Sequence, residues 1–271
     1  MVMISASSDR LYWSYRFEGQ DLQLLKKGTA NAEKITIAFW IKATKTGTNI
    51  LELYDNDNGR AVSTAYTVSS SDTWEHKVVN FPADTTGALG DDNGGSLYLF
   101  WYLGAGTDYT SGTLQTTWAS ATNANRIVGQ VNHGDNTSNN VHLTGVQMEV
   151  GEFSSTTLPP FQHEDFGDNL QRCKRYFETQ TGFYFFSFQS GTNVTHNAFI
   201  NCKVEKRATP TGSYSGSILN FYPNTGGGNS ETNNVTAITV GDKHGSTFLA
   251  FDSEGGAPTD AGYYPIYADA R

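Results

Sequence analysis

Apolar and polar residues alternate along much of the first 150 residues, with the two-residue period of half-buried β-strands. The first such segment runs from 11 to 17, and residues 35–41 repeat the pattern. Further strands are predicted at 49–54, from 61 onward, and at 74–81, 97–103 and 141–150. The run 97–103 is apolar throughout, which is typical of a strand buried on both faces. The pattern therefore predicts a mainly β chain that begins with a jelly-roll β-sandwich.

One segment instead has helical spacing. Its apolar residues Phe166, Leu170, Cys173 and Phe177 recur every three to four positions. Acidic residues near its start and basic residues near its end suit the helix dipole. We expect a helix over 166–177 whose apolar stripe packs against a neighbouring module. A stiff connector with two adjacent prolines precedes it.

Strand patterns return after the helix. They are predicted at 183–188, 198–204, 217–222, 235–240 and 246–252. We therefore expect three parts: a jelly-roll β-sandwich at 1–152, a linker and helix at 153–180, and a smaller C-terminal β domain at 181–271.

Charge and composition exclude several partners. The formal net charge is −9, and no basic cluster exceeds 172–175, which argues against nucleic-acid binding. An acidic surface repels polyanions, so a glycan ligand is expected to be neutral or bridged by a cation. No apolar stretch approaches the ~18 residues of a membrane span, and the first residues lack the pattern of a signal peptide. We expect no membrane insertion.

The cysteines and the acidic turns are the candidates for covalent or metal chemistry. Cys173 and Cys202 lack metal-type spacing, and two isolated buried thiols are favoured over a disulfide. Acid-rich turns offer oxygen ligands for a structural calcium, and no other cofactor is expected. Because hairpin turns need the same residue types, turn chemistry is the favoured interpretation. The candidate ligands are Asp55, Asp57, Asp91 and Asp92.

Sugar binding requires an aromatic ring against the C–H face of the sugar, with polar groups for its hydroxyls. Tyr109 and Trp118 are the aromatic candidates because they lie in a polar, loop-like stretch. Gln115, Asn123 and Asn125 are the hydrogen-bonding candidates in the same stretch. Ordinary packing is the alternative for Trp118. Trp40 and Trp101 lie in strand runs and are assigned to the core or to packing between subunits.

The sequence shows no catalytic constellation. It lacks a nucleophile elbow, a zinc-binding helix motif and a phosphate-binding loop. Its six histidines are scattered. We therefore expect a protein that is not an enzyme.

Several short sequence motifs follow one another along the chain. They are 17–21 (FEGQD), 28–32 (GTANA), 37–42 (IAFWIK), 72–75 (DTWE), 103–106 (LGAG), 143–151 (LTGVQMEVG), 160–163 (PFQH) and 173–176 (CKRY). Through them, residues 10–177 resemble a module of bacteriophage tail-fibre proteins, common in marine phages, that is similar to a carbohydrate-binding jelly roll. Residues 207–211 (RATPT) and 267–271 (YADAR) are similar to the small β domain that often follows it.

The resemblance implies a virion protein, made in the host cytoplasm and extracellular in the mature particle. It implies a homotrimer that contacts other virion proteins and takes part in host attachment through a cell-surface glycan. The expected subunit interface contains Leu170, Cys173, Phe177, Phe183 and Phe185. The alternative is a capsid decoration or head-fibre protein without a sugar-binding role.

The beginning of the chain departs from this family. Related modules usually have one or two strands before the position of Leu11, which here lies close to Met1. We expect either a short sandwich that another chain completes or a separately encoded component.

Overall fold

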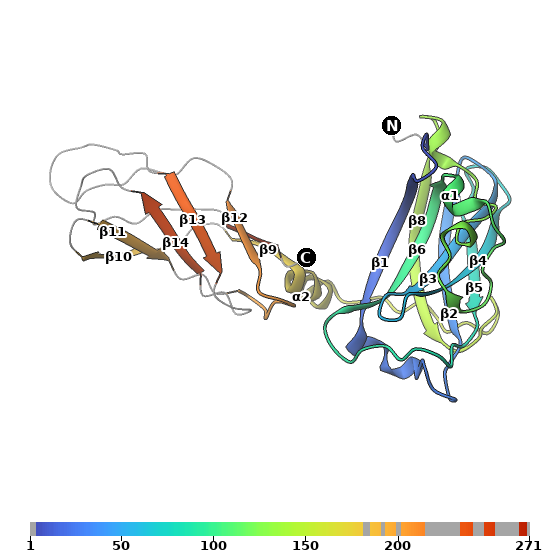
Figure 1. The fold of residues 1–271 in the computed structure, drawn as a ribbon, viewed down its shortest axis with the longest axis horizontal. Coiled ribbons are helices and arrows are strands. Elements are labelled where there is room, and N and C mark those ends of the chain that lie inside the picture. Colours follow the sequence, from blue (N-terminus) through green and yellow to red (C-terminus); the bar gives the residue numbers. More distant parts are fainter. Residues whose placement is uncertain are drawn as a thin grey trace. The chain divides into compact units, whose positions relative to one another are not determined.

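The computed structural model describes residues 4–180, 185–190, 193–198, 202–214, 234–240, 247–252 and 266–269. The chain forms two compact units, Met1–Phe161 and Gln162–Arg271 (Figure 1). The boundary lies within the range that the sequence assigns to the linker and helix. The helix belongs to the second unit.

The first unit is a β-sandwich of two antiparallel sheets. Sheet A has the strand order β1-β6-β3-β4-β7, and sheet B has the order β5-β2-β8. The strands are β1 (Arg10–Glu18), β2 (Ile35–Ala43), β3 (Gly47–Asp55), β4 (Arg60–Val68), β5 (Glu75–Phe81), β6 (Gly95–Ala105), β7 (Ala119–Ser120) and β8 (Val141–Val150). The prediction of a mainly β chain with an N-terminal sandwich and a short helix is confirmed.

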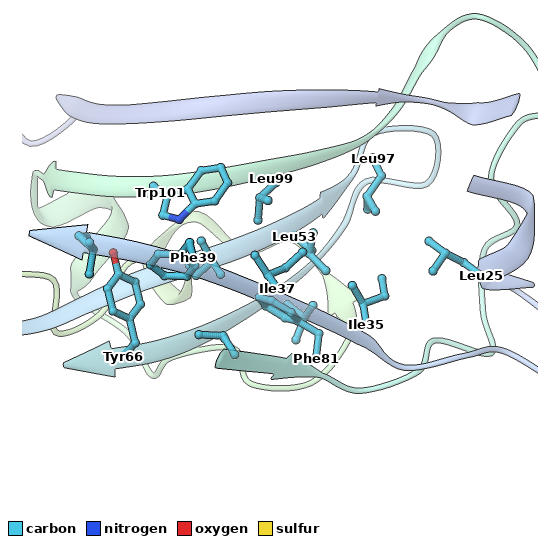
Figure 2. Packing of buried hydrophobic residues seen from close by; sticks show 14 of the residues in the cluster. Leu25, Ile35, Ile37, Phe39, Leu53, Tyr66, Phe81, Leu97, Leu99 and Trp101 are labelled. Carbon is cyan, nitrogen blue, oxygen red and sulfur yellow. The ribbon is translucent and has the colours of Figure 1, made fainter. Parts of the chain in front are cut away.

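The main core lies between the two sheets. Alternation along β2 places Ile35, Ile37 and Phe39 on its inner face, where each is at most 3% exposed. Phe39 makes edge contacts with Tyr66 and Trp101, with ring centroids 5.2 and 5.9 Å apart respectively. Figure 2 shows these side chains pointing toward one another between the strands. Their burial fixes which residues of each strand face outward.

The segment after β6 covers the outer face of sheet A. It contains the helix α1 (Thr107–Thr110) and the 3₁₀ turns η2 (Asn123–Asn125) and η3 (His133–Asp135). Its Ile127 packs with Ile50, Phe100 and Tyr102 in a second buried cluster. This cover explains why β6 is buried on both faces, as its apolar run predicts.

A buried ion pair fixes this cover to the sheet. Arg126 donates two hydrogen bonds of 2.7 Å to the carboxylate of Glu52, which is fully buried on β3. The hydroxyl of Tyr102 donates to the same carboxylate at 2.5 Å. Because the two charges satisfy each other, they are accommodated away from water.

The second unit contains the helix α2 (Phe166–Tyr176), close to the predicted range 166–177. Asp165 caps it by accepting a 2.7 Å hydrogen bond from the N–H of Gly167. The strands are β9 (Phe177–Gln180), β10 (Phe185–Ser190), β11 (Asn193–Ala198), β12 (Thr211–Tyr214), β13 (Asn234–Val240), β14 (Thr247–Asp252) and β15 (Ile266–Asp269). They form one sheet of order β12-β15-β9 and two pairs, β10-β11 and β13-β14.

The sequence located these strands unevenly. The predicted strands at 235–240 and 246–252 match β13 and β14 closely. The predicted strand at 198–204 is wrong, because β11 ends at Ala198 and residues 202–204 form no strand. The predicted strand at 217–222 lies outside the described residues. Cys173 is exposed and Cys202 is partly exposed, so the prediction of buried thiols is wrong.

Candidate functional site

Two exposed tryptophans lie on a part of the outer face of sheet B that the described residues of the first unit leave uncovered. Trp40 on β2 is 44% exposed, and Trp74, directly before β5, is 43% exposed. Their neighbours are Lys42, His76 and His142. We call these five residues the tryptophan face.

Strand register brings the five residues together. Because Phe39 and Ile41 point into the core, Trp40 and Lys42 point outward. Trp40 lies opposite His76 on β5, and Lys42 lies opposite His142 on β8. Residues paired in this way across antiparallel strands share one face of the sheet.

Each tryptophan has a histidine beside it. The rings of Trp40 and His76 are 5.0 Å apart and tilted by 31°. The rings of Trp74 and His142 are 6.3 Å apart. The ammonium of Lys42 lies 5.9 Å from the centroid of the Trp74 ring, within the range of a cation–π contact. The face thus combines apolar rings with hydrogen-bond donors.

A glycine on β8 leaves room for the Trp40 ring. Gly145 has a φ of +58°, and a Cβ there would lie 3.2 Å from Cδ1 of Trp40. The pairing of β2 with β8 also shifts register between Ala38 and Trp40. A glycine tolerates both the left-handed backbone and the close approach of the ring.

The turn that carries Trp74 is held from both sides. Asp72 has a φ of +52°, and its N–H donates to the carbonyl of Ala43 at 2.9 Å. The carboxylate of Glu75 accepts hydrogen bonds of 2.9 and 2.7 Å from the N–H groups of residues 69 and 70. Burial disfavours the ionised carboxylate of Glu75, but Lys77 and these N–H groups outweigh it and lower its pKa. The turn is therefore positioned before any ligand arrives.

The connector covers the other half of this outer face. Asn80 donates to the carbonyl of Phe153 at 3.0 Å, and the N–H of Phe153 donates to the hydroxyl of Thr36 at 3.1 Å. Gln147 donates to the carbonyl of Pro159 at 3.0 Å. The tryptophan face is thus a bounded area, because residues 153–159 cover the adjacent half of the sheet.

The arrangement fits the chemistry of sugar binding. Indole rings contact the C–H face of a pyranose, and imidazole and ammonium groups hydrogen-bond its hydroxyls. Trp74 lies two residues before His76, the partner of Trp40, so the tryptophans are offset by about 6–7 Å along the strands. The face therefore has room for more than one sugar ring.

The predicted sugar-binding tryptophan has a structural role. Trp118 is partly buried against the main core, and its indole N–H donates to the carbonyl of Pro82 at 2.8 Å. The ammonium of Lys27 lies 4.9 Å from its ring centroid. These contacts occupy both the ring and its only donor, so the geometry favours the packing interpretation of this residue.

The other predicted sugar ligands also make contacts within the fold. Tyr109 packs on the second cluster beneath the guanidinium of Arg10. Gln115 donates to two backbone carbonyls, at 2.7 and 3.0 Å, and Asn125 accepts a hydrogen bond from a backbone N–H at 3.0 Å. Asn123 is exposed on η2. Sugar binding by these residues stays a prediction.

The acid-rich turns use their carboxylates internally. Asp55 is buried and forms an ion pair with Lys27, while Asp57 and Asp92 accept backbone N–H groups at 2.9 and 2.7 Å. Asp91 is exposed. Within the described ranges, no group of three or more His, Cys, Asp or Glu side chains could hold a metal ion. Turn chemistry accounts for these residues, and the calcium site stays a prediction.

The predicted interface residues on the helix and at the start of β9 are exposed. Leu170 is 37% exposed, Phe177 is 48% exposed, and Cys173 is exposed beside them. Phe183 lies outside the described residues, and Phe185 is described only as the first position of β10. None of the helices in the described part of the chain is long and apolar enough to cross a membrane.

Comparison of the chain with models of protein families, with curated proteins and with solved structures found no match. The case for the tryptophan face as a binding site therefore depends on its geometry alone. The sequence assigned Trp40 to the core or to packing between subunits, and its 44% exposure excludes the core. The Thr144-Gly145 pair, which lies beside Trp40 on β8, is the one sequence signal that could have indicated an exposed ring packed over a glycine.

Proposed function

We propose that this chain is a non-enzymatic adhesive component of a phage fibre, and that the tryptophan face binds a glycan on the host surface. The sequence blocks that resemble phage tail-fibre modules support the first part. The exposure of Trp40 on β2 and of Trp74 directly before β5 supports the second and carries the proposal.

Leaving indole rings exposed to water is unfavourable, so their position on the surface indicates a binding partner. A protein partner would be expected to bury a continuous apolar patch. Here each ring instead has a histidine beside it, and Lys42 lies close by. This mixture of rings and hydrogen-bond donors matches a sugar better than it matches an apolar protein surface.

The test is binding to an array of bacterial surface polysaccharides, followed by titration calorimetry with the strongest hit. Trp40→Ala and Trp74→Ala are each expected to weaken binding at least about tenfold, which corresponds to about 1.4 kcal/mol. Circular dichroism of each variant would check that the sandwich remains folded, because neither side chain belongs to the core.

A third variant separates the two candidate sites. Trp118→Leu keeps an apolar side chain at the sandwich edge but removes the ring, and it should bind as the wild type does. Loss of binding in this variant alone would move the site to the stretch predicted from the sequence. Failure of the folded wild-type protein to bind any glycan, with labelled protein on the capsid, would favour the head-fibre alternative.

A further inference from the structure

One side of the sandwich is open. β1 is an edge strand of sheet A, and β8 is an edge strand of sheet B. Among the described residues, each of them pairs with one strand only. An apolar groove of about 480 Å³ lies between them. Its lining includes Trp13, Tyr15, Phe17, Trp101, Val146 and Met148.

The groove is bordered by exposed apolar side chains. Trp13 is 39% exposed, Tyr15 is 59% exposed, and Val146 is 40% exposed. An edge strand with exposed aromatic residues is a template for pairing with another strand, unless charges or a cover protect it. Apart from Ser14, the described residues that line the groove have aromatic or aliphatic side chains or the thioether of Met148.

The sequence of β1 indicates which strand fits. Its nine residues, RLYWSYRFE, are close to symmetric about Ser14. When two such strands pair antiparallel about an axis at Ser14, Trp13 faces Tyr15 of the second copy, and Leu11 faces Phe17 of the second copy. Side chains in such pairs lie about 4.5–5.5 Å apart at Cβ, so the aromatic rings meet over the two grooves.

The charges are compatible with this register. Tyr12 faces Arg16 of the second copy, an aromatic–guanidinium pair, and Arg10 faces a glutamate, so no like charges oppose each other. Moving the axis to Trp13 places Arg10 opposite Arg16, which is repulsive. An axis between two residues is excluded, because it pairs groove-facing residues with outward-facing ones.

We propose that two copies of the chain associate by antiparallel pairing of their β1 strands about a twofold axis at Ser14. The contact is isologous, because each copy supplies both the protruding rings and the groove that receives them. It extends sheet A of one copy into sheet A of the second copy. This interaction surface is separate from the tryptophan face, which lies on the outer side of sheet B.

Disulfide trapping tests the axis directly, in the full chain with Cys173→Ser and Cys202→Ser. Two residues on the axis have Cα atoms about 4.5–5.5 Å apart, within the range of a disulfide. Ser14→Cys is therefore expected to form a covalent dimer under mild oxidation. In this register, residue 16 of one copy lies four residues, or about 13 Å, from residue 16 of the second copy. Arg16→Cys, on the same face as Ser14, should therefore form no disulfide.

Light scattering of the wild-type chain gives the second measurement. The expected mass is about 59 kDa, twice 29.6 kDa. Tyr15→Asp places a charge at the pairing edge and is expected to give a folded monomer by circular dichroism. A monomeric wild type at micromolar concentration would overturn the proposal. So would a trimer without the Ser14→Cys disulfide, or a Tyr15→Asp variant that remains dimeric.

Discussion

The two sheets of the sandwich differ in how far other segments of the chain cover their outer faces. The outer face of sheet A is covered by residues 107–131 and fixed by the buried pair of Glu52 and Arg126. Within Met1–Phe161, the described residues cover the outer face of sheet B where the connector lies and leave Trp40 and Trp74 exposed. Both faces carry aromatic residues, so aromatic content alone does not distinguish a folding face from a binding face. What distinguishes them is whether the chain itself supplies the partners.

The largest expected effect concerns the covered face. Arg126→Met leaves the carboxylate of Glu52 buried without its partner, which is expected to cost about 3–5 kcal/mol of unfolding free energy. Urea-induced unfolding measures it. The matched control is Lys26→Met, because the pair of Lys26 with Glu33 is exposed, with side-chain exposures of 53% and 40%. That variant should lose less than about 1 kcal/mol. Equal losses in both variants would contradict the role given to the buried pair.

A smaller effect is expected on the open face. Gly145→Ala forces an alanine into the left-handed region, at a cost of about 1–2 kcal/mol, and places its methyl group against Trp40. Gly59→Ala is the matched control, because Gly59 also has a positive φ of +63° but no atom within 4 Å of an added Cβ. Both variants should lose similar stability. Only Gly145→Ala should change tryptophan fluorescence and weaken glycan binding. The same binding loss in both variants would mean that Gly145 does not position the ring.

The smallest effect is a pH dependence near the covered face. His133 is 6% exposed, its Nε2 lies 2.7 Å from Oδ1 of Asn49, and its Nδ1 has no hydrogen-bond partner among the described residues. Burial, and then Lys45, lower its pKa, against the smaller opposing effect of Asp135. Below the ordinary histidine pKa of about 6.5, the unfolded chain therefore binds a proton that the folded chain does not.

Unfolding free energy is thus expected to fall as the pH drops below about 6.5, and to be independent of this group above it. Thermal unfolding between pH 5 and 8 measures the slope. His133→Asn should flatten this slope. His163→Asn replaces an exposed histidine and is the control, in which the slope should remain. A slope that survives in His133→Asn would assign the pH dependence to another group.

Most of the sandwich could be predicted because its strands alternate in the sequence. The segments at 11–17 and 35–41 correspond to β1 and β2, since local period decides which side chains a strand can bury. The end of β11 was missed because residues 198–204 are apolar enough to resemble a strand, while the chain pairs the earlier segment with β10 instead. Pairing between strands is a tertiary choice that local composition does not contain.

The tryptophan face could not be predicted for a related reason. Trp40 lies in the run IAFWIK, where nearly every residue is apolar, so the sequence does not show which face remains bare. Trp118 lies among polar residues and resembled a loop platform, yet a backbone carbonyl lies within reach of its indole N–H. In both cases exposure depends on where a distant segment lies, which the neighbouring residues do not determine.

The attachment of residues 153–159 to sheet B has a mechanical consequence. A pull on the chain at Phe161 would first load the bonds that Gln147 and Asn80 make to the backbone of this segment. Gln147 makes one bond to Pro159, and Phe153 is bonded to both Asn80 and Thr36, so the two attachments would yield one after the other. The ladder between β2 and β8 lies behind them, and its many bonds would resist together when the strands are sheared. The connector would thus act as a short extensible tether that absorbs tension before the binding face is deformed.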